Sequence, residues 1–176
     1  LTSGLWLGGM DFGYRDPTVL LWAQLDEHVV LRIVDELVVQ EHTTETIIEA
    51  ANKRAWPRPQ WIGADPAGRQ RSEHTGLSTV QLWRRAGFSL RTGATTIQAG
   101  VMAVRRRLDG ADGRTRLFVH PRCRVLCDAL VSYHYPPDRP SSDTPVKDGH
   151  DHAADALRYL IVNLDVMSGE ATVRRY

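Results

Sequence analysis

The first forty residues contain three runs of hydrophobic positions that have the length of β-strands. They lie at Leu5–Asp11, Thr18–Leu25 and Val29–Val39. A turn at Gly13–Pro17 and the polar residues at positions 26–28 separate them. Apolar runs of this length between turn residues predict strands, and the short connections predict that the three strands form an antiparallel meander.

Beyond residue 40 the hydrophobic positions repeat with a helical period, and the helices alternate with short apolar runs. The expected helices begin at Thr43 or Thr44 and end at Trp56–Pro57, and then cover Leu77–Ala86, Thr96–Leu108, Arg122–Tyr133 and His152–Met167. The expected strands among them are Trp61–Ala64, Phe88–Leu90 and Leu117–Val119. A proline-rich loop is expected at Tyr135–Asp148. We therefore expect an α/β fold: a mixed sheet of five or more strands, antiparallel in its first three, with helices on both faces.

Length and composition indicate one globular domain over residues 1–176, since 42% of the residues are hydrophobic and 24% are charged. No apolar run approaches the roughly 20 residues that a membrane span needs. Asp11 and Arg15 interrupt the first apolar stretch, so we expect neither a signal peptide nor secretion. The chain begins at Leu1 rather than at methionine, and we expect it to be a fragment.

The net charge of +1 does not indicate a polyanionic partner, but the charges are unevenly distributed. Eight arginines and two aspartates lie between Arg84 and Arg116, a local excess of six positive charges. Three of them, at positions 105–107, are consecutive on a helix and point about 100° apart, so at most two can face one DNA strand. Arg105 and Arg106 are the candidates, and a solvated helix face is the alternative. Lys147, in the proline-rich loop, is either a contact for DNA phosphate or a solubilising residue.

Three aspartates occur where the expected elements begin or end. Asp11 ends the first strand, Asp65 follows the strand Trp61–Ala64, and Asp155 lies in the first turns of the last helix, three residues after His152. If the two strands are neighbours, the three carboxylates meet at one edge of the sheet. Clustered carboxylates favour bound Mg²⁺ or Mn²⁺, and two such ions about 4 Å apart support phosphodiester hydrolysis. Spacing alone leaves open that each aspartate is a turn or cap residue.

Three segments carry a family resemblance. Gly9–Pro17 (GMDFGYRDP), Ala64–Gly68 (ADPAG) and Asp151–Tyr159 (DHAADALRY) resemble the three acidic motifs of the nuclease domain of terminase large subunits, the DNA-packaging enzymes of tailed bacteriophages. The connecting segments Gly100–Arg105 and Cys123–Tyr133 are also similar to that family. The resemblance spans nearly the whole chain, in the expected order.

The resemblance implies a ribonuclease H-like fold and an endonuclease that cuts concatemeric double-stranded viral DNA during packaging. Asp11, Asp65 and Asp155 would be the ligands of Mg²⁺ or Mn²⁺, with two ions bound. His152 would lie beside them as a ligand, proton carrier or substrate contact. The family implies further partners, namely an ATPase domain, a small terminase subunit and the portal, and action in the host cytoplasm during virus assembly. Because the chain has no G-x-x-x-x-G-K-[S/T] loop, we expect cleavage without ATP hydrolysis.

Several polar residues admit two interpretations. Asp151 could be an auxiliary site residue, but a helix N-cap or a first-turn partner of the helix dipole is the favoured interpretation. Glu36 could be a fourth carboxylate, although an exposed strand position fits better. Cys123 and Cys127, with His120, have no second pair of ligands at zinc spacing and are expected in the core.

Two other functions share these features. A Holliday-junction resolvase or a transposase or integrase core would have the same acidic cluster and would differ in its preferred DNA. A non-catalytic module that docks on DNA or on a capsid protein is the other alternative, although all three acidic positions are present.

Overall fold

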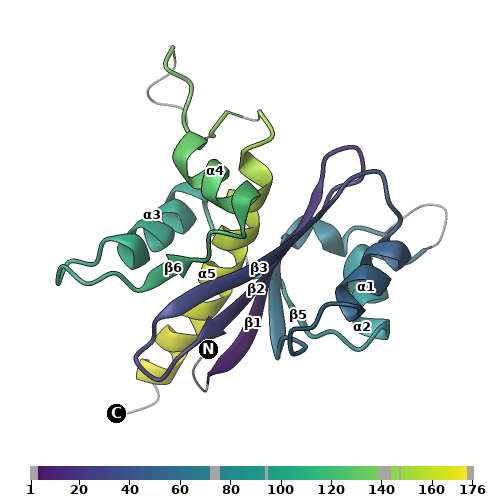
Figure 1. Cartoon of the computed structure of the whole chain (residues 1–176), viewed down its shortest axis with the longest axis horizontal. Helices are drawn as coiled ribbons and strands as arrows, with labels where there is room; N and C mark the ends of the chain where they lie inside the picture. Colours follow the sequence, from purple (N-terminus) through teal and green to yellow (C-terminus); the bar gives the residue numbers. More distant parts are fainter. Residues whose placement is uncertain (1–3, 72–75, 94, 139–143, 147, 174–176) are drawn as a thin grey trace.

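One mixed sheet forms the centre of the molecule. The computed structural model describes residues 4–71, 76–93, 95–138, 144–146 and 148–173, and six strands lie within these ranges. They are β1 (Leu5–Asp11), β2 (Thr18–Leu25), β3 (Leu31–Val39), β4 (Trp61–Ala64), β5 (Leu90–Arg91) and β6 (Leu117–Val119). Their spatial order is β5-β4-β1-β2-β3-β6 (Figure 1).

The direction of pairing changes between the centre and the edges of the sheet. β1 pairs with β2, and β2 with β3, in antiparallel fashion, which confirms the predicted meander. β4 lies parallel to β1, β5 parallel to β4, and β6 parallel to β3. The mixed α/β sheet predicted from the sequence is therefore the fold that the chain adopts.

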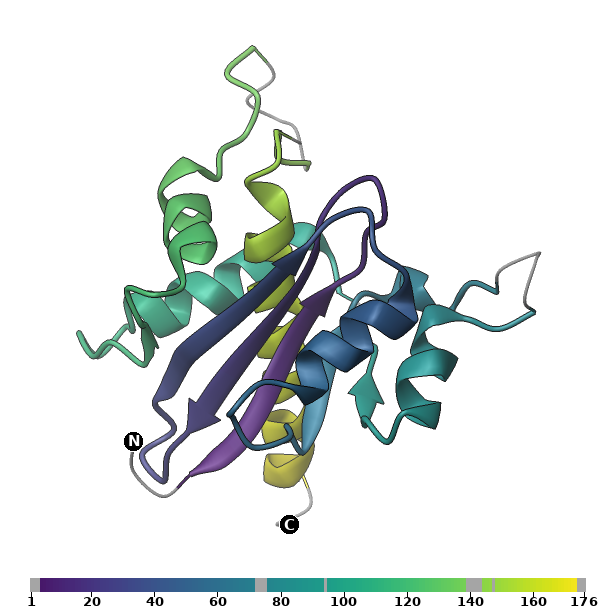
Figure 2. The ribbon, with the colours of Figure 1, turned by 45° about the vertical axis from the view of Figure 1, so that its right-hand side comes forward.

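Helices cover both faces of this sheet. They are α1 (Thr44–Asn52), α2 (Thr79–Arg85), α3 (Ile97–Leu108), α4 (Arg124–Ser132) and α5 (Asp151–Val173), with a short 3₁₀ helix η1 (Pro66–Arg69) after β4. α1 and α2 lie on one side of the strands, and α3, α4 and α5 on the other (Figure 2). None of the helices in the described residues combines the length and hydrophobicity that a membrane span requires.

Alternation along the strands divides the core into two clusters. Leu7 of β1 and Trp61 of β4 pack with the buried face of α5, around Leu157 and Leu160. The alternate positions of these strands, such as Met10, pack against α1 and α2. Side chains of a strand point to opposite faces in turn, so each face buries one half of the apolar residues.

Two predicted boundaries differ from the structure because side chains have better partners than the next turn or ladder. The third strand begins at Leu31 rather than Val29, since the Asp26 carboxylate accepts the backbone N–H groups of His28 and Val30 in a turn that gives Val29 a positive φ of 62°. β5 excludes Phe88, whose ring instead packs edge-on against Trp83.

The first helix also stops earlier than expected, at Asn52 rather than at Trp56. The indole of Trp56 stacks on Trp6 with ring centroids 5.6 Å apart and donates from Nε1 to Asp35. This contact with the sheet requires residues 53–56 to leave the helical path.

Candidate active site

The last helix crosses the sheet in direct contact with two glycines. A Cβ atom on Gly9 of β1 would overlap the carbonyl oxygen of Ala156, and one on Gly63 of β4 would overlap that of Tyr159. Only glycine permits this approach of backbone to backbone. The two glycines therefore fix where the first turns of α5 lie over the ends of β1 and β4.

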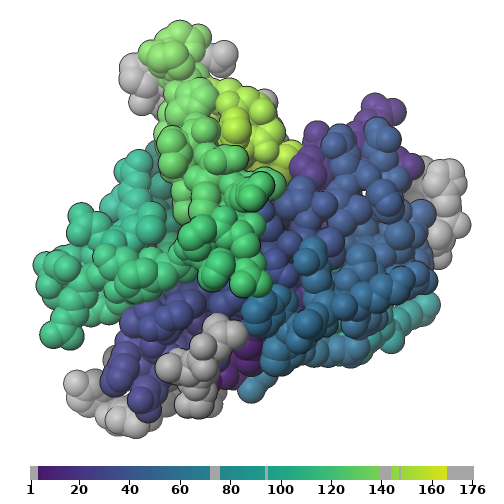
Figure 3. All heavy atoms as spheres, viewed as in Figure 1, coloured from purple at the N-terminus to yellow at the C-terminus, as the bar shows by residue number. Residues whose placement is uncertain are grey.

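This crossing brings the three predicted aspartates to one end of the sheet. Met10 pairs with Ala64 across the parallel strands, so Asp11 and Asp65 follow at neighbouring positions. Each comes two residues after a glycine that faces α5, and alternation turns both toward that helix. Asp155 directly precedes Ala156, the residue over Gly9. In the space-filling view, the start of α5 and the β1–β2 turn stand on either side of a notch at this end (Figure 3).

Asp11 has the strongest electrostatic perturbation of the three. Only 7% of the residue is exposed, and this burial is the main reason why its pKa rises to about 6. The negative charges of Asp155 and Asp65 raise the pKa further, whereas the hydrogen bond with His152 lowers it. The three carboxylates are thus close enough to interact, and a buried carboxylate in this position favours neutralisation by a proton or a cation.

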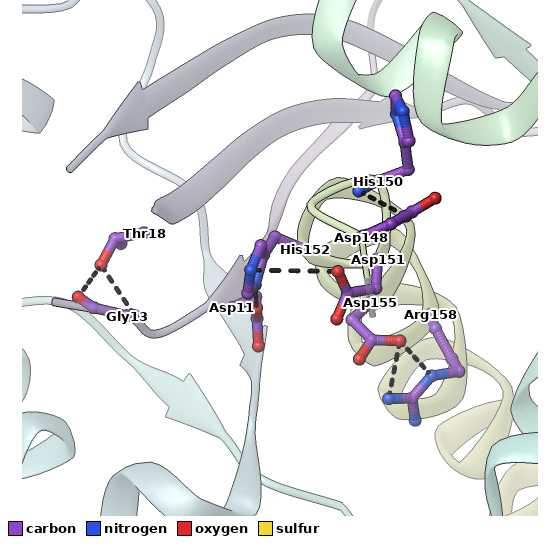
Figure 4. Close-up of polar contacts among 9 residues, drawn as sticks. All are labelled: Asp11, Gly13, Thr18, Asp148, His150, Asp151, His152, Asp155 and Arg158. Carbon is purple, nitrogen blue, oxygen red and sulfur yellow. Dashed lines mark hydrogen bonds and ion pairs between the residues drawn. The ribbon is translucent and has the colours of Figure 1, made fainter. Parts of the chain in front are cut away.

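His152 lies between two carboxylates. Its Nδ1 is 2.9 Å from Oδ2 of Asp11, and its Nε2 is 3.9 Å from Oδ1 of Asp151 (Figure 4). The hydrogen bond with Asp11 is the largest cause that raises the pKa of His152. A histidine in this environment can hold a proton beside Asp11.

Asp155 is held by an arginine from its own helix. Nε and an Nη of Arg158 both lie 3.0 Å from Oδ1 of Asp155 (Figure 4). The arginine is buried, and its guanidinium lies 4.4 Å from the centre of the Tyr159 ring. Its aliphatic part occupies the space above Gly100 of α3, where a Cβ would be 2.7 Å from Cγ and Cδ of Arg158.

Asp65 combines a cap with a place in the site. Its Oδ1 accepts the backbone N–H of Ala67 at 2.9 Å, which caps η1. The residue also borders a cavity of about 310 Å³ together with Asp151 and Asp155. The cap and the site are therefore compatible roles of the same carboxylate.

Asp151 is the first residue of α5 and is only 5% exposed. Within the described part of the chain, its buried Oδ1 has no hydrogen-bond partner. A first-turn carboxylate still interacts favourably with the helix dipole. An unsatisfied buried oxygen is costly, however, and this one belongs to a residue that lines the cavity.

The carboxylates do not form a closed metal-binding group. Among the described residues, no three His, Cys, Asp or Glu side chains are close enough together to hold one ion. The donor set nevertheless fits a hard divalent cation, because it consists of carboxylate oxygens. The unpartnered Oδ1 of Asp151 and the raised pKa of Asp11 both indicate a site that accepts positive charge.

The predicted DNA contacts lie elsewhere or cannot be placed. Arg105 and Arg106 are exposed on α3 and are not among the residues that line the carboxylate cavity. Arg105 instead borders a smaller cavity between α3, α4 and α5. Lys147 lies outside the described residues.

Glu36 is neither a fourth site carboxylate nor an exposed strand residue. Its two carboxylate oxygens accept the backbone N–H groups of Val125 and Leu126 at 2.9 and 3.0 Å, and so cap the start of α4. The residue before this helix, Cys123, is buried, and burial raises the pKa of its thiol to about 12. The described residues contain no zinc-binding group that includes His120, Cys123 and Cys127.

Sequence reasoning did not identify the glycines at positions 9, 63 and 100 or the wall of the cavity formed by Gly93, Thr95 and Ile97. A glycine inside a strand pattern is a signal of close backbone approach, and Gly9 and Gly63 carry that signal. The cavity wall has no comparable signal, because it depends on how α3 packs beside α5.

Comparisons with known proteins agree with this geometry. The model of the terminase RNase H-like domain family matches residues 8–164. The nuclease domain of the P22 large terminase has a similar structure, with a TM-score of 0.67 and 19% identity over 90% of this chain and 84% of that one. The large terminase nuclease from the thermophilic phage G20c with bound zinc gives a TM-score of 0.60 and 15% identity, over 90% of this chain and 80% of that one.

A third similar structure is a longer one, the large terminase of another thermophilic bacteriophage, with a TM-score of 0.71 and 18% identity over 93% of this chain. The chain spans about 40% of the length of that terminase. No curated protein matches the chain. Since the family model covers most of the sequence, the chain belongs to the terminase RNase H-like domain family.

Proposed function

We propose that this chain is the divalent-metal-dependent endonuclease domain of a phage large terminase, which cuts concatemeric double-stranded DNA during genome packaging. The observation that carries the proposal is the meeting of Asp11, Asp65 and Asp155 at one end of the sheet, in a chain of this family. Related nuclease domains have been solved with bound zinc and with bound cobalt, which supports a divalent ion in this one.

In this proposal Asp11, Asp65 and Asp155 hold two Mg²⁺ or Mn²⁺ ions. Such ions would neutralise the carboxylates, activate water and stabilise the leaving oxygen of the cleaved phosphodiester. His152 holds a proton beside Asp11 and orients its carboxylate. Arg158 holds Asp155 in place through two hydrogen bonds to one oxygen, which leaves the other oxygen outside this contact.

The complete protein would supply what this chain does not contain. We propose that an ATPase domain, a small terminase subunit and the portal bring DNA to the site in the host cytoplasm during assembly. Cutting by the isolated chain is then expected to be slow and sensitive to salt, because a net charge of +1 provides little attraction for DNA.

Cleavage of a supercoiled plasmid in Mn²⁺ tests this function. The Asp11→Asn variant is expected to remain folded and to lose cleavage, whereas Asp128→Asn, an exposed aspartate on α4, is expected to cut normally. Cutting by the Asp11→Asn variant would refute the assignment. A strong preference for four-way junctions over linear duplex would favour a resolvase, and a wild-type chain that binds neither Mn²⁺ nor Mg²⁺ would favour a non-catalytic docking module.

A further inference from the structure

We propose that the cavity beside the carboxylates also binds a DNA phosphate, on the wall formed by Gly93, Thr95 and Ile97 at the start of α3. This inference rests on the proposed nuclease function and assigns a substrate contact to residues that the acidic motifs do not include. The ligand is one phosphate group of the DNA backbone, next to the ions at the carboxylates.

The cavity has two chemically different walls. One consists of Asp65, Asp151 and Asp155, and the other of Gly93, Thr95 and Ile97. The whole segment from position 86 to position 108, which includes the second wall, contains no aspartate or glutamate. A phosphate that approaches the carboxylates can therefore avoid their repulsion on this side.

The second wall contains the N-terminus of a helix of 12 residues. The first N–H groups of a helix have no partners within it, and the helix dipole gives this end a partial positive charge. Thr96 caps α3 by accepting the N–H of Ala99 at 3.2 Å, and its first turn contains no acidic residue that would neutralise the dipole. Helix N-termini of this kind bind phosphate groups.

The second wall is also attached to the helix that carries the acids. The backbone N–H of Gly93 donates to Oδ1 of Asn163 at 2.9 Å, and Nδ2 of the same asparagine donates to the carbonyl of Tyr159 at 2.8 Å. Asn163 belongs to α5, as do Asp151 and Asp155. The distance between the two walls is therefore set by one helix, as a site for a bound group requires.

An independent observation indicates that this cavity takes a ligand. Oδ1 of Asp151 is buried without a hydrogen-bond partner among the described residues, and Asp151 lines the same cavity. A cation would satisfy that oxygen, and a phosphodiester is the anion that would accompany the cation in a nuclease. The guanidinium of Arg158, which also borders the cavity, adds a fixed positive charge.

The test is the affinity of the full chain for a short DNA duplex, measured by fluorescence anisotropy at low salt in Ca²⁺. Thr95→Asp places a negative charge on the wall but is favourable to the dipole of α3. Gln98→Glu adds the same charge in the first turn of α3, at an exposed position outside the cavity lining. Thr95→Asp is expected to weaken binding about tenfold, Gln98→Glu much less, and neither variant is expected to lower the melting temperature.

Thr95→Lys, with Gln98→Lys as its control, provides a test of opposite sign and is expected to strengthen binding. Equal effects at positions 95 and 98 would overturn the phosphate site, as would a wild-type chain that binds no duplex. If Asp11→Asn still abolishes cleavage while the Thr95 variants bind DNA like the wild type, only the phosphate site is wrong. If the Thr95 variants change DNA affinity but the wild type cuts no DNA, the nuclease proposal is the one that fails.

Discussion

Nδ1 of His152 lies 2.9 Å from Oδ2 of Asp11, and this contact joins the end of β1 to the start of α5 across 141 positions of the sequence. Both residues have raised pKa values, Asp11 mainly through burial and His152 mainly through the hydrogen bond to Asp11. The fold thus keeps at its centre of chemistry a carboxylate whose charged form is disfavoured until a cation is present.

The first prediction concerns the stability of the metal-free domain. The pKa of Asp11 is about 6 in the folded chain and 3.8 without these interactions, so the folded state binds the proton more tightly. The resulting stabilisation is complete below pH 3.8 and is lost as the pH rises through about 6. Asp11→Asn removes the buried charge, and is expected to raise the melting temperature at pH 8 but not at pH 4.

The size of that gain is limited. A shift of this size corresponds to at most about 3 kcal/mol, and the altered contact with His152 reduces it. Thermal unfolding in a chelator at the two pH values measures the difference, with Asp128→Asn as the control. An equal change at pH 4 and pH 8 would show that the burial of the Asp11 charge does not limit stability.

The second prediction concerns metal binding. If Asp11, Asp65 and Asp155 hold divalent ions, Mn²⁺ stabilises the folded state, by about 2.7 kcal/mol at a concentration of 100 times Kd. The melting temperature of the wild-type chain is expected to rise with added Mn²⁺ and to fall again with excess chelator. Asp11→Asn should lose most of this response. A response of the variant as large as that of the wild type would place the ion elsewhere.

The third prediction concerns the contact between α5 and the sheet. A Cβ atom at position 9 overlaps the carbonyl oxygen of Ala156, which belongs to the helix backbone and cannot rotate away. Gly9→Ala is expected to cost about 3 kcal/mol or more and to displace Asp155 from Asp11. Gly8→Ala is a matched control, since its Cβ would meet the side chain of Ile62 on the other face. Urea unfolding of both variants decides whether the backbone contact is the critical one.

The sequence was sufficient for the elements whose pattern is local. Hydrophobic runs with clear ends gave β1, β2, β4 and β6 their observed bounds. The adjacency of Asp11 and Asp65 followed from the assumption that β1 and β4 are neighbours, which the parallel pairing confirms. The bracing of Asp155 by Arg158 was also within reach, because residues three apart on a helix are neighbours.

Features that depend on contacts between distant segments could not be predicted in this way. Glu36 looked like an exposed strand residue, yet its carboxylate caps a helix that begins 88 positions later, at Arg124. The second wall of the cavity depends on the packing of α3 against α5, which no periodicity in either helix specifies. Such contacts are determined by the assembled tertiary structure rather than by local propensity.

The fourth prediction uses this cap. Glu36 accepts two backbone N–H groups at the start of α4, where Cys123 makes no side-chain cap. Glu36→Ala leaves those groups without their partner, and is expected to lower the free energy of unfolding by about 1–2 kcal/mol. Cleavage per folded molecule should be unchanged, because the cap lies outside the carboxylate cavity. Glu27→Ala, at an exposed turn, is the control, and an equal loss of stability there would exclude capping as the cause.

The fifth prediction separates positioning from stability. Alanine normally stabilises a helix interior by about 1 kcal/mol relative to glycine, yet at position 100 its Cβ would be 2.7 Å from Cγ and Cδ of Arg158. The arginine would have to move, and its two hydrogen bonds to Asp155 would be lost. Gly100→Ala is therefore expected to reduce the cleavage rate by about tenfold or more with only a small change in melting temperature.

A double-mutant cycle checks that the loss acts through Arg158. Arg158→Lys removes the Nε donor and keeps the charge, so it is expected to slow cleavage by itself. If Gly100→Ala acts by displacing the arginine, the effects on rate are not additive, and the double variant cuts about as slowly as Arg158→Lys alone. Additive losses would mean that position 100 affects the site by another route, because a displaced guanidinium cannot be lost twice.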